Sequence, residues 1–325
     1  MTTLTVADVP LDADGPAQRL RRTAAAARVS LRWWGTHRRL PAHQKEEVGA
    51  GYAADARFLT AGKKIIDTRH EAFRRLTSVR TRLVNFWRGL TLPFTEPGIR
   101  LIRQSDIEPF VHAMEGFREE LAEAEAGLDA VYEDVKADAR NRLGRLYDEA
   151  DYPAEVAGLF GVEWDFPAVE PPSYLLCLSP EVYEQERQRV AARFEDAVRL
   201  AEQAFADEFA RLLSHLAERL APDEGGARKV FRDSAVGNLT EFFNRFARLN
   251  VRSSPELDAL VEQAQGLVRG VSPQDLRDSG ALRQHVATEM ARVQAGVEAL
   301  ITEAPRRRLV RMRPSENGAS HDPAR

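Results

Sequence analysis

Basic and aromatic side chains gather in the N-terminal third of the sequence, where they could bind nucleic acid. The face of a tryptophan can stack on a base, and arginine or lysine can meet the phosphates of a single strand. The residues of these types are Trp33, Trp34, Arg38, Arg39, Lys63, Lys64, Arg69, Arg74 and Arg75. The sequence makes them candidate nucleic-acid contacts, and the alternative is that at least one tryptophan packs in the core.

Residues that could perform catalysis do not form a recognisable motif. Gly62 and Lys63 resemble the end of a phosphate-binding loop, but Arg57 stands where that loop needs glycine and Lys64 where it needs serine or threonine. No G-x-G-x-x-G follows a predicted strand, and neither G-x-S-x-G nor the Glu-x-x-His of di-metal helical bundles occurs. We therefore expect no catalytic residue, no cofactor and no metal, and we expect that the chain is not an enzyme.

The single cysteine, Cys177, lies in an apolar run, which predicts a buried structural thiol rather than a nucleophile. One cysteine cannot form an internal disulfide, and no secretion leader opens the chain, so we expect a reducing cytoplasm. No apolar run reaches the roughly 20 residues of a membrane-spanning helix, so we expect no membrane partner. The many arginines indicate a GC-rich genome and hence a bacterial source.

Composition and charge describe a globular chain with an uneven charge layout. Hydrophobic residues make up 43% of the 325 and charged residues 30%, which predicts one or two folded domains. The net charge is +10 over residues 1–103, −18 over 104–226 and +4 over 227–325. Such blocks indicate either a basic face for nucleic acid or oppositely charged helices that lie against each other inside the fold, and we favour the second interpretation.

Long helices dominate the hydrophobic pattern. A first helix is predicted over 54–90, and a second begins at an expected capping box, Ser105 with Glu108, and ends at Tyr152 and Pro153. Along the second, apolar residues repeat with the strict heptad spacing of a coiled-coil seam: Ile107, Phe110, Met114, Phe117, Leu121, Ala124, Leu128, Val131 and Val135. This helix must pair with another, and the sequence leaves open whether the partner helix belongs to the same chain.

Further elements follow from capping signals and alternation. Helices are predicted over 179–220, 228–249, 255–269 and 273–303, the last with a break near Ser279. The first of these has an apolar stripe that repeats every eleven residues, which favours a straight course. Alternation over 29–33 and 162–166 and an apolar run over 174–178 predict one small sheet, with a helical alternative open for 29–34.

The predicted fold is mainly α: an elongated bundle of long antiparallel helices with coiled-coil-like packing, plus a small β element. We expect a flexible N-terminus with a short strand-like segment over 1–53 and a long-helix body over 54–226, with a β insertion near 160–178. A C-terminal helical subdomain over 227–304 and a disordered basic tail over 305–325 complete this division.

The run RVSLRWWG over 28–35, followed by GKKIID over 62–67 and an arginine-rich helix, resembles a family of uncharacterised bacterial and phage proteins. The resemblance covers about the first half of the chain and assigns no functional residue. It implies a place on mobile elements near genes for AAA+ ATPases and von Willebrand A-like proteins. It thereby implies an adaptor role, with an AAA+ ATPase as a partner.

The leading hypothesis is a non-catalytic helical scaffold or adaptor that binds other protein chains, or itself, through its long seams. The alternative is a nucleic-acid-binding protein that uses the basic N-terminal third. A third hypothesis is an enzyme whose site is assembled from residues far apart in the sequence, and a deep pocket with strongly perturbed titratable groups would favour it.

Overall fold

The computed structural model describes residues 15–220 and 234–303, so the predicted tail over 305–325 lies outside it. The chain divides into two units, one formed by residues 1–205 and 240–255 (unit 1) and one by 206–239 and 256–325 (unit 2). The described residues are mainly helical and include a small antiparallel sheet, as the sequence predicts.

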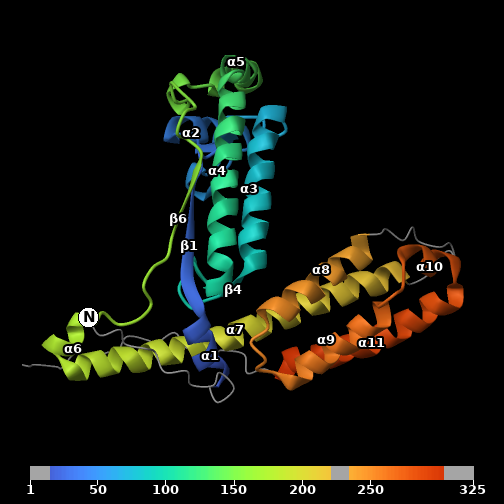
Figure 1. Cartoon of the computed structure of the whole chain (residues 1–325). Coiled ribbons are helices and arrows are strands. Elements are labelled where there is room, and N and C mark those ends of the chain that lie inside the picture. The colour runs from blue at the N-terminus through green and yellow to red at the C-terminus, as the bar shows by residue number, and fades with distance from the viewer. Residues whose placement is uncertain (1–14, 221–233, 304–325) are drawn as a thin grey trace, which may run out of the picture. The chain divides into compact units, whose positions relative to one another are not determined.

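The sheet belongs to unit 1 and has the strand order β4, β5, β1, β6 (Figure 1). β1 (Ala24–Arg32) follows the short helix α1 (Pro16–Thr23) and pairs antiparallel with two strands. Its first half pairs with β5 (Ile99–Arg103) and its second half with β6 (Gly161–Asp165). β4 (Thr91–Pro93) pairs with β5 at the edge. Two of the three predicted sheet segments are therefore confirmed, while β4 and β5 were not predicted.

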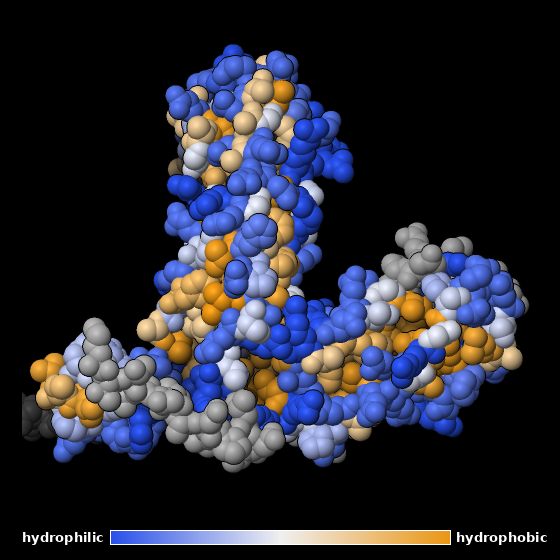
Figure 2. All heavy atoms as spheres, viewed as in Figure 1, coloured by the Kyte–Doolittle hydropathy of each residue, from blue (hydrophilic) through white to orange (hydrophobic). Residues whose placement is uncertain are grey.

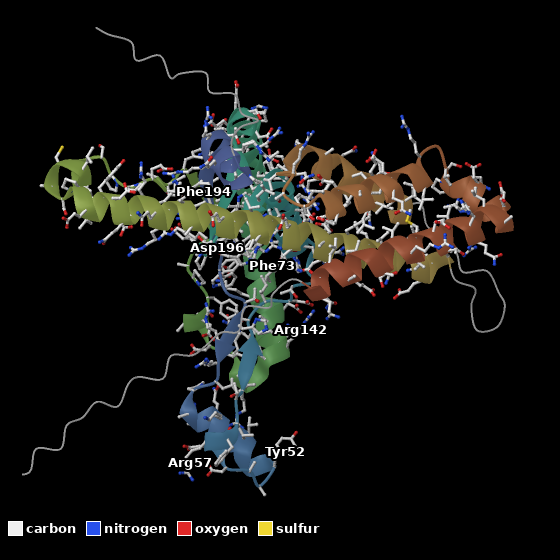
Figure 3. All side chains as sticks on the ribbon, turned by 90° about the horizontal axis from the view of Figure 1, so that it is seen from below. Tyr52, Arg57, Phe73, Arg142, Phe194 and Asp196 are labelled. Carbon is white, nitrogen blue, oxygen red and sulfur yellow. The ribbon has the colours of Figure 1, made fainter. Side chains whose placement is uncertain are left out.

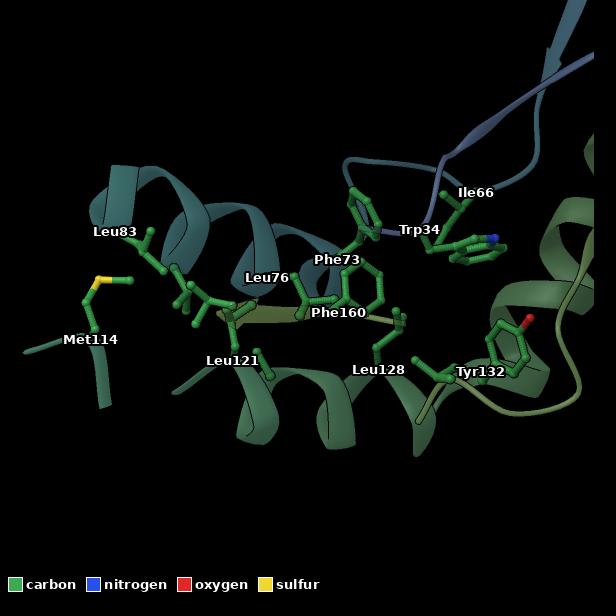
Figure 4. Close-up of a cluster of buried hydrophobic side chains, with 14 of the residues drawn as sticks. Trp34, Ile66, Phe73, Leu76, Leu83, Met114, Leu121, Leu128, Tyr132 and Phe160 are labelled. Carbon is green, nitrogen blue, oxygen red and sulfur yellow. The ribbon is translucent and has the colours of Figure 1, made fainter. Parts of the chain in front are cut away.

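Two long helices of unit 1, α3 (Glu71–Leu90) and α4 (Ile107–Asp129), lie antiparallel and side by side (Figure 1). Leu76 and Leu83 of α3 and Leu121 and Leu128 of α4 are almost completely buried. They meet in one hydrophobic cluster that also takes side chains from the sheet and its flanking loops (Figure 4). The core of unit 1 therefore lies between this helix pair and the sheet.

A two-stranded ribbon, β2 (His37–Arg39) with β3 (Gly62–Lys64), precedes α3. The connection between its strands contains the helix α2 (Ala42–Gly51) and the 3-10 turn η2 (Ala56–Phe58). The predicted first helix is therefore wrong over 54–70. Asp67 gives the physical reason for the late start of α3, because its side chain accepts a hydrogen bond from the backbone N–H of Arg69 and closes a turn.

The second predicted helix is divided in the structure. α4 ends at Asp129, and α5 (Tyr132–Leu143) begins after Val131, whose ψ of 11° is not helical. Gly144, with a φ of 51°, ends α5 and leads into the 3-10 turns η4 (Gly144–Leu146) and η5 (Glu149–Asp151).

The expected capping box of Ser105 and Glu108 does not form. Ser105 lies in the 3-10 turn η3 (Gln104–Asp106), and no side chain caps α4.

The third predicted helix is confirmed as α7 (Pro180–Leu220), a helix whose residues contribute to both units. The segment before it was predicted wrongly. Residues 174–178 form the short helix α6 (Tyr174–Leu178), and Cys177 within it is exposed instead of buried. Pro171 and Pro172 precede α6 and cannot donate backbone hydrogen bonds to a neighbouring strand, which disfavours a sheet there.

The remaining helices are α8 (Ser234–Leu249), α9 (Pro255–Val268), α10 (Pro273–Asp278) and α11 (Gly280–Glu303). The predicted break near Ser279 is confirmed, because it separates α10 from α11. In unit 2, Arg283 of α11 donates to the last carbonyls of α7, and Gly296 lies against Leu260 of α9. The core of unit 2 includes Phe209, Leu213, Val261, Met290 and Val293.

Candidate functional site

The heptad seam of α4 and α5 closes within the chain. Most of its predicted residues are buried in the core of unit 1, namely Phe110, Met114, Leu121, Leu128 and Val135. The others, Ile107, Phe117 and Val131, are partly buried and pack against the same core. Phe86 of α3 contacts both Phe110 and Phe117, with ring centroids 6.5 and 5.7 Å away. The partner helix that the sequence left unidentified is therefore α3.

The opposite charges of α3 and α4 also meet within the fold. The charges of α3 are mostly arginines, and those of α4 are mostly glutamates. Arg82 of α3 forms an ion pair with Glu120 of α4, and its guanidinium also lies over the ring of Phe117. Part of the uneven charge layout is thus explained by two helices that lie against each other.

Both candidate tryptophans pack inside unit 1. Trp34 is buried and makes edge contacts with Tyr132 and Tyr152. Trp33 packs edge-on against Phe73 and Phe160. The guanidinium of Arg80 lies 4.7 Å from the centroid of the Trp33 ring. Trp34 thus lies in the core and Trp33 packs against it partly buried, which agrees with the core alternative.

Lys63 and Arg38 are engaged with the chain itself. Lys63 is buried, donates to the carbonyl oxygen of Leu146 at 2.6 Å, and places Nζ 2.7 Å from Oδ2 of Asp151. Arg38, its neighbour across the ribbon, donates to the carbonyl oxygens of Gly35 and His37 and lies 3.8 Å from Asp151. These two cations fasten the ribbon to the segment after α5, and Lys63 is not available to a ligand.

The other candidate cations are exposed, but only some lack a partner. Arg69 bonds to Asp67 and Arg75 to Glu71, whereas no described residue pairs with Arg39, Lys64 or Arg74. In the β2–β3 register His37 stands opposite Lys64, and Arg39 stands opposite Gly62. Because directly opposed residues share a face, His37, Arg39 and Lys64 form one exposed basic face of the ribbon.

Two exposed aromatic residues in the connection between the ribbon strands were missed by the sequence reasoning. Tyr52 and Phe58 lie in the β2–β3 connection and are 83% and 88% exposed. Figure 3 places Tyr52 and Arg57 at the outer end of that connection. The spacing of apolar residues gives no signal for them, because α2 and η2 bury almost no side chains and therefore have no apolar stripe.

A cavity of about 470 Å³ opens between the β3–α3 loop and α5. Its floor is apolar, with Ile65, Ile66 and Leu143, and its charged lining includes Asp67 and Arg142. The pKa of Asp67 is held well below its ordinary value by the backbone N–H of Arg69 and then by the side chains of Arg69 and Arg142. A carboxylate held by two arginines is fixed as an anion, which suits a structural clamp and not a general acid or base.

A run of exposed apolar side chains lies at α6 and the first turn of α7. Tyr174, Leu176, Leu178 and Val182 are exposed, and we call them the α6 patch. Figure 2 shows hydrophobic surface at the end of α7 where α6 lies in Figure 1. Cys177 is exposed within the same run.

Within residues 15–220 and 234–303, no group of three or more histidine, cysteine, aspartate or glutamate side chains could hold a metal ion. None of the helices in these ranges is long and apolar enough to cross a membrane. Comparison with known proteins found no match to a protein-family model, to a curated protein or to a solved structure.

Proposed function

We propose that the chain is a non-catalytic helical scaffold or adaptor that assembles with protein partners or with itself. The α6 patch is the observation that supports this best. Four large apolar side chains within residues 174–182 face solvent. Scattered single apolar residues are normal on a surface, but a contiguous group of them is typical of an interaction site.

The heptad of α4 does not indicate a partner from another chain, because α3 of the same chain packs along it. The antiparallel packing of α3 against α4 supports the finer prediction of an elongated antiparallel bundle with coiled-coil-like packing. A cytoplasmic location and service in a mobile-element-encoded assembly with an AAA+ ATPase belong to the same proposal.

The test compares two variants that each change exposed apolar residues. L176E/L178E places charges in the α6 patch, whereas F58E places one at a more exposed apolar site in the β2–β3 connection. Nuclease-treated pull-down from the host and light scattering of the purified chain measure protein partners and self-association. We expect the wild type and F58E to associate and L176E/L178E to lose association at least tenfold, since burying a charge in an apolar contact is costly.

Two results would contradict the scaffold proposal. One is a wild-type chain that stays a monodisperse monomer with no protein partner. The other is association that survives L176E/L178E unchanged, which would remove the α6 patch as its basis. The single thiol of Cys177 provides a site for a fluorescent label that reports directly on coverage of this patch.

A nucleic-acid-binding function is the second candidate, and the ribbon supports it. Its basic face, His37, Arg39 and Lys64, leads into a connection with two exposed aromatic rings, Tyr52 and Phe58. Cations beside stacking surfaces are the usual means of binding a single strand.

We expect the affinity for a labelled oligonucleotide to fall steeply with salt, and R39Q/K64Q to make this salt dependence less steep. R187Q, on the exposed face of α7, is the matched control. Affinity that does not depend on R39Q/K64Q would exclude this face.

A further inference from the structure

The strand β6 forms one edge of the four-stranded sheet in unit 1. It is hydrogen-bonded to β1 on one side, and within residues 15–220 and 234–303 no strand pairs with its other side. In an antiparallel pair, alternate residues direct their N–H and C=O groups away from the neighbouring strand. No backbone group of the described ranges outside β1 bonds to residues 161–165. We call this row of outward-directed groups over 161–165 the β6 edge.

The opposite edge of the sheet is less able to accept another strand. β4 has only three residues and ends at Pro93, which has no N–H to donate. The carbonyl oxygen of Thr91 already accepts from Nη2 of Arg100 at 2.8 Å. β6 is longer and contains no proline. Of the two edges, the β6 edge is therefore the one that an extended segment could join.

Two charges of opposite sign lie along the β6 edge. Glu163 is exposed and has no ion pair with any described residue. Arg32 stands opposite Gly161 in the β1–β6 register, and it too is exposed without an ion pair in this part of the chain. A Cβ atom at Gly161 would lie 2.9 Å from Nη2 of Arg32, so the guanidinium occupies the place of the missing side chain. Asp165, the next residue on this face, is already paired with Arg28. The edge thus presents a cation at position 161 and an anion at position 163.

The other face of β6 is apolar. Val162 is buried, and Trp164 is partly buried and packs against the core of unit 1. The guanidinium carbon of Arg118 lies 5.2 Å from the centroid of the Trp164 ring. Successive side chains of a strand point to opposite faces, so an added strand would place one set beside the charges and the other beside Val162 and Trp164. A complementary segment therefore alternates polar with apolar residues.

We propose that the β6 edge binds an extended segment of a partner protein as an added antiparallel strand, with Lys or Arg opposite Glu163 and Asp or Glu opposite Gly161. Strand addition to a free sheet edge obtains affinity from backbone hydrogen bonds and specificity from side chains. A second copy of the chain fits less well, because the register that overlaps all of β6 places two Glu163 side chains opposite each other.

The inference rests on the proposed scaffold function and adds a second contact surface, because the residues of the β6 edge are not those of the α6 patch. A partner that contacts both surfaces loses affinity when either one is changed.

The test measures the fluorescence anisotropy of two short labelled peptides with the purified full chain. Both alternate threonine with valine. The first has lysine in place of its central threonine and glutamate in place of the next threonine, and the second has these two residues exchanged. In the antiparallel register the first peptide places lysine opposite Glu163 and glutamate opposite Gly161. We expect the wild type to bind the first peptide about tenfold more tightly, because opposite charges directly across a strand pair attract and like charges repel.

The charge exchange R32E/E163K should reverse this preference by a similar factor. It leaves the net charge unchanged, and neither side chain makes a hydrogen bond or ion pair in the described ranges whose loss could unfold the chain. E262K/R269E is the matched control, because it exchanges the same two charges at exposed positions of unit 2 and should keep the wild-type preference.

N-methylated forms of the first peptide test the backbone hydrogen bonds. Alternate residues of a strand direct their N–H groups to opposite edges, so methylation of one alternate set should abolish binding and methylation of the other should leave it unchanged. No binding of either peptide, equal binding of both by the wild type, or binding that tolerates both methylated forms would overturn the proposal. A wild-type dimer that E163K dissociates would also overturn it and assign the edge to a second copy. L176E/L178E should bind the first peptide as the wild type does, which separates failure at the β6 edge from failure at the α6 patch.

Discussion

At the scale of single residues, the ion pair of Lys63 and Asp151 joins the ribbon to the segment after α5. The side chain of Lys63 is 4% exposed and that of Asp151 is 17% exposed. A buried pair is not strongly stabilising in itself, but removing one partner leaves the other charge uncompensated. We expect D151N to lower the free energy of unfolding by about 3 kcal/mol in urea denaturation. The control is D134N, an exposed change on α5, whose free energy of unfolding should stay within about 0.5 kcal/mol of the wild type. If D151N has a similarly small effect, the ion pair does not contribute to the stability of the fold.

Tyr152 gives the fold a dependence on alkaline pH. Its hydroxyl donates to the carbonyl oxygen of Ile65 at 2.8 Å, and burial raises its pKa to about 12. An unfolded tyrosine ionises near pH 10. The folded state therefore holds this proton more tightly. Its contribution to stability is complete below about pH 10 and is lost as the pH rises through about 12.

The measurement is the free energy of unfolding between pH 9 and pH 12, together with absorbance near 295 nm. Y152F should remove part of the fall in stability and one late-titrating phenol, whereas Y174F, at an exposed site, should keep both. A wild type and Y152F with the same pH dependence would contradict the assignment.

At the scale of elements, α4 is stabilised by its own chain. Leu121 and Leu128 are 1% and 0% exposed and face α3. We expect L121A to lower the free energy of unfolding by about 3 kcal/mol while the molar mass in solution stays the same. The control is A122S, which lies one residue away on the exposed side of α4 and should be nearly neutral. A change of oligomeric state in L121A would mean that the seam also binds another chain.

Local signals predicted the elements that depend on local interactions. The capping box of Ser272 with Asp275 and the proline that begins α7 are determined by neighbouring residues, and both elements were predicted. The start of α3 was not, because a turn at Asp67 and the pairing of Gly62 with Arg39 override a weak helical pattern. The heptad predicted which side of α4 is buried but could not identify α3 as the partner helix. The spacing of apolar residues along one helix contains no information about which other helix packs against it.

The candidate site was less predictable than the fold. Tryptophan and lysine can bind nucleic acid or pack in a core, and only tertiary contacts distinguish the two roles for Trp33, Trp34 and Lys63. The exposed residues that remain, such as Tyr52 and Leu178, lie in short elements without periodicity. The β6 edge depends on the order of the strands in the sheet, which no linear motif could reveal.

At the scale of the whole molecule, the two units have separate cores. Leu121 lies in the core of unit 1 and Met290 in that of unit 2, and both are almost completely buried. We expect two calorimetric transitions, of which L121A lowers one and M290A the other. In that case the changes in unfolding free energy expected for D151N, Y152F and L121A refer to unit 1, to which all three residues belong. If both variants shift one shared transition, the units unfold as a single cooperative structure.

The central position of β1 in the sheet has a consequence for synthesis of the chain. Arg28 of β1 bonds to Asp165 of β6, which lies 137 residues later in the sequence. At a translation rate of roughly 5–20 residues per second, β1 leaves the ribosome on the order of ten seconds before β6 does. During that interval α3 and α4 can already pair. The edge of β1 that later receives β6 is then an unpaired strand edge on a nascent chain, and it is there that chaperone binding or misassembly would begin.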